Sequence, residues 1–158
     1  MKLWIISGAG RHVGKTYLAM RLQSVLPDAW LAKAGHNPKR PEKPSDYFTD
    51  VDSLLTHLGR LAERADDQAV RHAVIESNEL SRRGLGDLRI FLSAPPSRTD
   101  VRDDASHLAS CAQIVIGPEK PPLNAWRALI VPLTQNDSLA DAVLDCLSGQ
   151  HRHLFGQT

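Results

Sequence analysis

The stretch Gly8-Ala9-Gly10-Arg11-His12-Val13-Gly14-Lys15-Thr16 decides how the rest of the chain is interpreted. A short apolar run at residues 3–6 precedes it, which is typical of a strand buried on both faces. Apolar residues at helical spacing follow it from Leu18 to Leu26, where Pro27 ends the pattern. The stretch is therefore predicted to be a glycine-rich turn between a buried strand and a helix.

This turn departs by one residue from the common phosphate-binding pattern, in which a glycine stands five positions before Gly-Lys-Ser/Thr. That position is Ala9 here, and Gly8 lies one residue further back. The physical requirements are still met, because glycines let backbone N–H groups converge and a helix N-terminus attracts anions. We expect a nucleotide phosphate site formed by Gly8, Gly10, Arg11, His12, Val13, Gly14, Lys15, Thr16 and Tyr17.

Within this loop, Lys15 is expected to reach the β and γ phosphates as a catalytic group, and the Thr16 hydroxyl to hold Mg²⁺. Arg11 is a candidate electrostatic contact to the γ phosphate. The alternative is an ordinary strand-to-helix turn with a surface lysine. Such a turn does not require Gly-Lys-Thr directly after a buried strand.

Glu76 ends a second apolar run at residues 72–76, where parallel strands bring ligands to one sheet edge. Its expected catalytic role is to bind Mg²⁺ through water or to orient an attacking water. A solvated acid at a strand end is the alternative. Lys33, at the end of a predicted strand over 29–33, is a candidate partner for a phosphate or a carboxylate, or else a surface lysine.

Asp46 is a second candidate metal ligand, because Mg²⁺ bound to phosphates recruits one or two carboxylates. Asp50 is expected to cap a helix that begins at Val51. The loop from Gly35 to Ser45 carries three prolines and the basic residues Lys39, Arg40 and Lys43. This loop is expected either to cover a bound anion or to be solvated. His36 in this loop is a candidate substrate contact or a surface residue.

Length and composition indicate one folded domain over residues 1–149, with a tail at 150–158. The net charge of +1 gives no reason to expect nucleic acid or a membrane surface as a partner. Cys111 and Cys146 have no CxxC spacing, so neither a disulfide framework nor a zinc site is expected. With no recognisable signal peptide or membrane span, a cytoplasmic location is the expectation.

Short apolar runs alternate with helical patterns along the whole chain. Strands are expected at 3–6, 29–33, 72–76, 88–92, 114–116 and 128–131, and helices at 14–26, 51–65, 101–109 and 139–147. This alternation predicts an α/β fold of three layers, with a mostly parallel central sheet of about six strands and helices on both faces.

The loop from Gly8 to Thr16 resembles that of dethiobiotin synthetase and cobyrinic acid diamide synthase, members of the SIMIBI class of P-loop NTPases. The segments "LAKAGHNPKRPEKPSDYF" at 31–48 and "AVIESNELS" at 73–81 resemble the molybdopterin-guanine dinucleotide biosynthesis adapter family, MobB. Lys33 and His36 stand for that family's Lys-His, Ser45-Asp46 for its second element, and Ser77 replaces the glycine of its Glu-Gly-Asn. The resemblance implies a P-loop NTPase fold, Asp46 as the preferred metal ligand, Asn78 beside Glu76, and a homodimer.

The first functional hypothesis is Mg²⁺-dependent binding and slow hydrolysis of ATP or GTP by a MobB-like accessory factor in molybdenum cofactor maturation, with a small molecule or a cofactor-biosynthesis protein as partner. A second is a ligase or kinase like dethiobiotin synthetase, acting on a small carboxylate. A third is a regulatory module that binds nucleotide without turnover. The sequence contains no Asn-Lys-x-Asp motif, so ATP and GTP both stay open.

Overall fold

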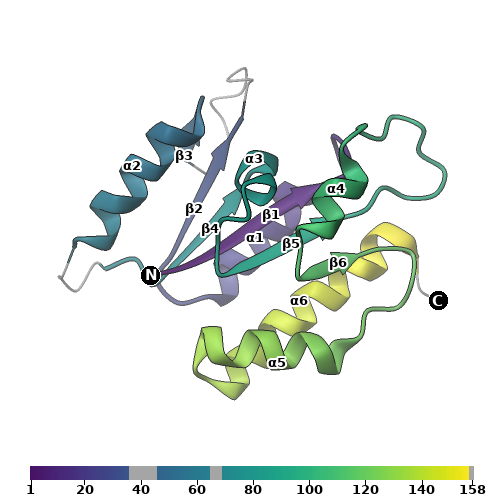
Figure 1. The fold of residues 1–158 in the computed structure, drawn as a ribbon. Coiled ribbons are helices and arrows are strands. Elements are labelled where there is room, and N and C mark those ends of the chain that lie inside the picture. Colours follow the sequence, from purple (N-terminus) through teal and green to yellow (C-terminus); the bar gives the residue numbers. More distant parts are fainter. Residues whose placement is uncertain (36–45, 65–68, 157–158) are drawn as a thin grey trace.

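The computed structural model describes residues 1–35, 46–64 and 69–156 and contains a six-stranded sheet whose described pairings are all parallel. The strand order is β3-β2-β4-β1-β5-β6 (Figure 1). The strands are β1 (Lys2–Gly8), β2 (Ala29–Ala34), β3 (Asp46–Phe48), β4 (His72–Glu76), β5 (Leu88–Leu92) and β6 (Ile114–Ile116). The central strands β1 and β4 are buried almost throughout, which explains their unbroken apolar runs.

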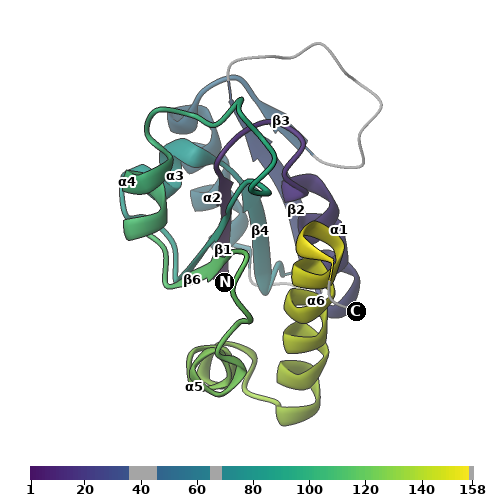
Figure 2. The ribbon, with the colours of Figure 1, turned by 90° about the vertical axis from the view of Figure 1, so that its right-hand side faces the viewer.

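Six helices in the described residues cover the two faces of this sheet. They are α1 (Lys15–Val25), α2 (Val51–Ala62), α3 (Asn78–Arg82), α4 (Ala105–Ser110), α5 (Leu123–Thr134) and α6 (Asp137–Phe155). Figure 2 shows the sheet nearly edge-on, with α3 and α4 on one side and α1 and α6 side by side on the other. The three-layer α/β architecture predicted from the sequence is thus confirmed.

Each face of the sheet has its own apolar core. Alternate residues of β1 separate them, because Trp4 and Ile6 pack toward α1, α5 and α6, whereas Ile5 packs toward α2 and α3. A smaller cluster joins Ala9 and Phe91 to Leu108 of α4. Since all strands are parallel, their carboxyl ends meet at one edge, and in register Glu76 lies beside both Ile6 of β1 and Lys33 of β2.

One expected strand is wrong. Residues 128–131 lie inside α5, and the sixth strand is β3. An apolar run of four residues fits a buried strand and a helix equally well by period alone. The helix is decided by packing, since Ile130 is fully buried one turn after the buried Trp126, while Leu129 between them is 39% exposed.

The chain after Gly149 also differs from the expected tail, because α6 continues to Phe155 and ends at Gly156 in the left-handed conformation. A glycine inside a helix costs only about 1 kcal/mol, so Gly149 does not end this one. Gln150 and His151 are both buried. The last turns of α6 are therefore part of the packed domain.

Some expectations lie outside the described residues, among them His36, Lys39, Arg40, Lys43 and Ser45. Within residues 1–35, 46–64 and 69–156, none of the helices combines the length and the apolar character needed to cross a bilayer.

Candidate phosphate and metal site

The loop between β1 and α1 has a row of backbone donors that find no acceptor among the described residues. None of the hydrogen bonds among the described residues is donated by the backbone N–H groups of residues 10–14. Gly14 caps α1 in the left-handed conformation, with φ +86°. The positive end of the α1 dipole adds to these donors. This is the local geometry of an anion site.

Gly8 is required by a close approach within the loop. A Cβ at this position would lie 2.7 Å from Val13 Cγ2 and 3.1 Å from the Leu92 carbonyl oxygen. Val13 is 1% exposed and packs in the core between the sheet and α1. The loop therefore folds back on the strand end, anchored by Val13, and Val13 offers the site its backbone rather than its side chain.

The Lys15 side chain lies along the same loop. Its Nζ donates to the Gly10 carbonyl oxygen at 2.5 Å. Burial lowers the pKa of Lys15; the Glu76 carboxylate acts in the opposite direction, and the charges of Lys33, Arg102 and Arg98 add to the lowering. An anion beside Lys15 would relieve this cost of a buried positive charge.

Glu76 accepts two hydrogen bonds and forms what we call the carboxylate corner, made of Thr16, Lys33 and Glu76. The Thr16 hydroxyl donates to Glu76 Oε2 at 2.7 Å, and Lys33 Nζ donates to Glu76 Oε1 at 2.6 Å. The Glu76 side chain is 8% exposed and that of Lys33 28%. The structure thus brings together three residues, predicted separately, from α1, β2 and β4.

Asn78 joins the start of α3 to the end of β1. Its Oδ1 accepts from the Gly8 N–H at 3.1 Å, and its Nδ2 donates to the Gly8 carbonyl at 3.3 Å. Ser77, which stands where the resembling family has glycine, caps α3 by accepting from the Leu80 N–H at 3.3 Å. These contacts fix the position of Glu76 relative to the loop from the next two residues along the chain.

Asp46 is not part of this cluster in any described contact. Its carboxylate accepts from the Trp30 indole N–H at 2.7 Å. Trp30 packs with the core on the α2 side of the sheet, whereas Glu76 and Lys33 follow the face toward α1. The role of Asp46 as a metal ligand stays a prediction. Asp50, by contrast, caps α2 as expected, accepting from the Ser53 N–H at 2.7 Å.

Three other predicted contacts lie on the outer side of the loop. Arg11 and His12 are exposed, and His12 has φ +55°. Tyr17 is 44% exposed and stacks on His153 of α6, with the ring centroids 5.0 Å apart. No described contact joins these side chains to the carboxylate corner.

Sequence reasoning missed two arginines on the segment between β5 and α4. The Arg102 N–H donates to the Ala9 carbonyl at 2.8 Å, and the charges of Arg98 and Arg102 act on Lys15. Asp100 and Asp104 pair with these arginines, and hydrogen bonds from Arg102 and then Arg82 lower the pKa of Asp104 to about 2. The only signal was position after a strand, and sequence alone did not reveal that β5 neighbours β1.

Gln150 of α6 was also missed, because it fell in the expected tail. Its side chain is fully buried, and both amide atoms lack a hydrogen-bond partner in the described part of the chain. A Cβ on Gly14 would lie 2.2 Å from Gln150 Nε2. The amide therefore lies directly against the N-cap of α1.

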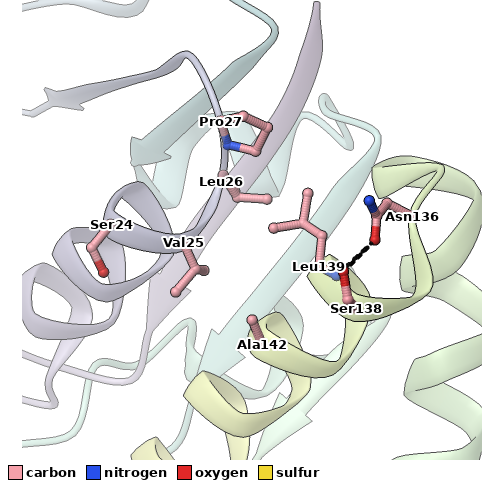
Figure 3. Close-up of a pocket in the computed structure, with 8 residues that line it drawn as sticks. All are labelled: Ser24, Val25, Leu26, Pro27, Asn136, Ser138, Leu139 and Ala142. Carbon is pink, nitrogen blue, oxygen red and sulfur yellow. Dashed lines mark hydrogen bonds between the residues drawn. The ribbon is translucent and has the colours of Figure 1, made fainter.

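A surface pocket lies at the other end of α1. It is lined by Ser24, Val25, Leu26, Pro27, Asn136, Ser138, Leu139 and Ala142 (Figure 3). The hydroxyl of Ser138 and the N–H of Leu139 both donate to Asn136 Oδ1, which caps α6. An eleven-residue helix is about 16 Å long, so this pocket is separate from the phosphate loop.

A scan against protein-family models finds no family that matches this chain, and a search of curated proteins finds no relative. The chemistry of the site therefore rests on its own residues. They supply unpaired backbone donors, a buried lysine, and a hydroxyl and a carboxylate 2.7 Å apart.

Proposed function

We propose that this chain binds ATP or GTP together with Mg²⁺ and hydrolyses the nucleotide slowly. The observation that carries the proposal is the run of N–H groups at residues 10–14 that have no acceptor in the described part of the chain, at the carboxyl edge of a parallel sheet and beside Lys15. Backbone donors at a helix N-terminus are a common cradle for phosphate oxygens. In this proposal Lys15 exchanges the Gly10 carbonyl for a phosphate oxygen.

The residues at the carboxylate corner fit Mg²⁺. Hard cations prefer oxygen ligands, and Thr16 Oγ1 and Glu76 Oε2 are such atoms. The residues that the structure describes contain no group of three or more His, Cys, Asp or Glu side chains able to hold a metal. In the proposal, Mg²⁺ takes its remaining ligands from phosphate and water. Bound there, the ion would neutralise developing charge on the phosphates.

Glu76 is proposed to orient the attacking water. Its two oxygens are occupied by Thr16 and Lys33, so the carboxylate is held in one position before a ligand arrives. Lys33 supplies the counter-charge of the carboxylate. A carboxylate fixed near the terminal phosphate can accept a hydrogen bond from water.

A MobB-like role in molybdenum cofactor maturation, a homodimer and a cytoplasmic location are the finer parts of the proposal. They rest on the resemblance of residues 31–48 and 73–81. Asn78, which lies in the second of these segments, contacts the loop by accepting a hydrogen bond from the Gly8 N–H.

Calorimetry with ATP and with GTP in Mg²⁺ tests the proposal. Lys15→Ala should weaken binding at least about 100-fold, because it removes a partly desolvated contact to phosphate. Lys120→Ala, a surface lysine on the segment between β6 and α5, is the matched control. Unchanged affinity in Lys15→Ala would reject the phosphate site. Turnover that requires an added small carboxylic acid would instead favour the ligase or kinase hypothesis.

A further inference from the structure

The Gln150 side chain is an unexplained buried polar group. It is 0% exposed, and neither Nε2 nor Oε1 has a hydrogen-bond partner among the described residues. A buried amide without partners is costly, and native structures keep few of them. A methionine at this position would fill similar space without that cost.

The position of the Gln150 amide nitrogen beside Gly14 indicates the role of this side chain. Nε2 occupies the space beside Gly14 where any other residue would carry its Cβ, 2.2 Å from that ideal position. The next side chain among the nearest atoms is Leu154, whose Cδ2 is apolar. The amide nitrogen therefore lies close to the backbone of the phosphate loop at Gly14.

The last turns of α6 are held in place by separate contacts. His151 Nε2 lies 2.8 Å from the Glu119 carbonyl oxygen, and His153 stacks on Tyr17 of α1. The residues on either side of Gln150 are thus held by the segment that follows β6 and by α1, and Gln150 itself is buried beside the start of α1.

From this geometry we propose that Gln150 is a positioning residue for the phosphate loop, and this rests on the nucleotide binding proposed above. Its amide holds the backbone at Gly14 in the left-handed conformation that aims the loop N–H groups at phosphate. When a phosphate is seated, the loop backbone adjusts and becomes the hydrogen-bond partner that the amide lacks in the free protein, and α6 is tied to the loaded loop.

The test uses Gln150→Met in the full chain, with Leu147→Met as the matched control one turn earlier in α6. Leu147 is also fully buried, and leucine to methionine keeps its volume. Removing the unpaired amide should raise the Tm of the nucleotide-free protein by a few degrees. The same change should weaken Mg²⁺-nucleotide binding about tenfold in calorimetry. Leu147→Met should leave the affinity unchanged.

Opposite signs in the two measurements distinguish a positioning group from a packing group. Wild-type affinity in Gln150→Met would overturn the inference. A lower Tm together with weaker binding would overturn it too, because the amide would then stabilise the free protein. A wild-type protein that binds neither ATP nor GTP removes the proposed function first, and the inference with it, before any variant is measured.

Discussion

The two edges of the parallel sheet differ in whether their polar groups have hydrogen-bond partners within the described residues. At the amino edge, the N–H of Leu3 donates to Asp87 at 2.8 Å, and the Trp4 indole donates to His72 Nδ1 at 3.0 Å. The N–H of Lys2 donates to the Arg71 carbonyl at 2.7 Å. At the carboxyl edge, residues 10–14 and the Gln150 amide keep polar groups without described partners. One edge is closed by the protein itself, and in our proposal a nucleotide completes the other.

This contrast separates stability from binding. Changes at the amino edge should alter the free energy of unfolding and leave nucleotide affinity alone, because every partner there is internal. Changes at the carboxyl edge should alter affinity or turnover. Glu76 lies between these cases, since its internal partners Thr16 and Lys33 are also the proposed ligand-binding groups.

The largest effect is expected from Gly14→Ala. An alanine in the left-handed region costs about 1–2 kcal/mol. Displacing Gln150 from the space of the new Cβ adds about 1–3 kcal/mol of overpacking. Denaturant unfolding should therefore show a loss of about 2–5 kcal/mol, together with weaker nucleotide binding.

Gly84→Ala is the matched control for this change. Gly84 has φ +68°, but a Cβ there would meet no atom within 4 Å, so only the torsional cost applies. Adding Gln150→Ala to Gly14→Ala should make the combined loss smaller than the sum of the two single losses. Equal losses in Gly14→Ala and Gly84→Ala would show that the contact with Gln150 carries no energy.

The next effect is on turnover. Glu76→Gln keeps an acceptor for Thr16 but leaves Lys33 without its counter-charge, at a cost to stability of about 1–2 kcal/mol. Phosphate release should fall about 100-fold, because the neutral amide is a poor acceptor for a water proton. Glu79→Gln is the control on neighbouring α3, where the acid forms ion pairs with Arg82 and Arg83 near the surface. Release at the wild-type rate in Glu76→Gln would remove Glu76 from the reaction.

The smallest expected effect is the pH dependence of the free energy of unfolding that arises from His72 at the amino edge. Burial lowers the pKa of His72, and the nearby N-terminus adds to the lowering. As pH falls below 6.5, the unfolded chain therefore takes up a proton before the folded one. The free energy of unfolding should decrease by at most about 1.4 kcal/mol per pH unit from this group.

His72→Asn is the variant that isolates this dependence. An asparagine oxygen can still accept from the Trp4 indole, so the hydrogen bond is kept while the titration is lost. Between pH 7 and pH 5, the free energy of unfolding should decrease less steeply with falling pH in the variant than in the wild type. Nucleotide affinity should be unchanged. An identical slope in both proteins would assign the pH dependence to other groups.

The sequence was sufficient for five of the six described strands and for the residues that meet next to the loop. Apolar runs and glycine spacing located β1, α1, β4 and the residues of the carboxylate corner, because local period and strand ends decide these. The strand predicted at 128–131 failed since period is ambiguous in so short a run. Gln150, Arg98 and Arg102 could not be found, because their places depend on which strands and helices are neighbours in space.

The most direct test of the account is a titration of the ¹⁵N-labelled protein with Mg²⁺ and ATP or GTP, followed by backbone amide resonances. Gly10 and Gly14 report on the carboxyl edge, and Gly86, whose Cβ position lies 3.5 Å from the Leu3 carbonyl oxygen, reports on the amino edge. We expect the Gly10 and Gly14 amide resonances to move on binding, as these amides acquire phosphate acceptors, while the Gly86 resonance stays in place. Saturation with either nucleotide that leaves Gly10 and Gly14 unmoved would contradict it.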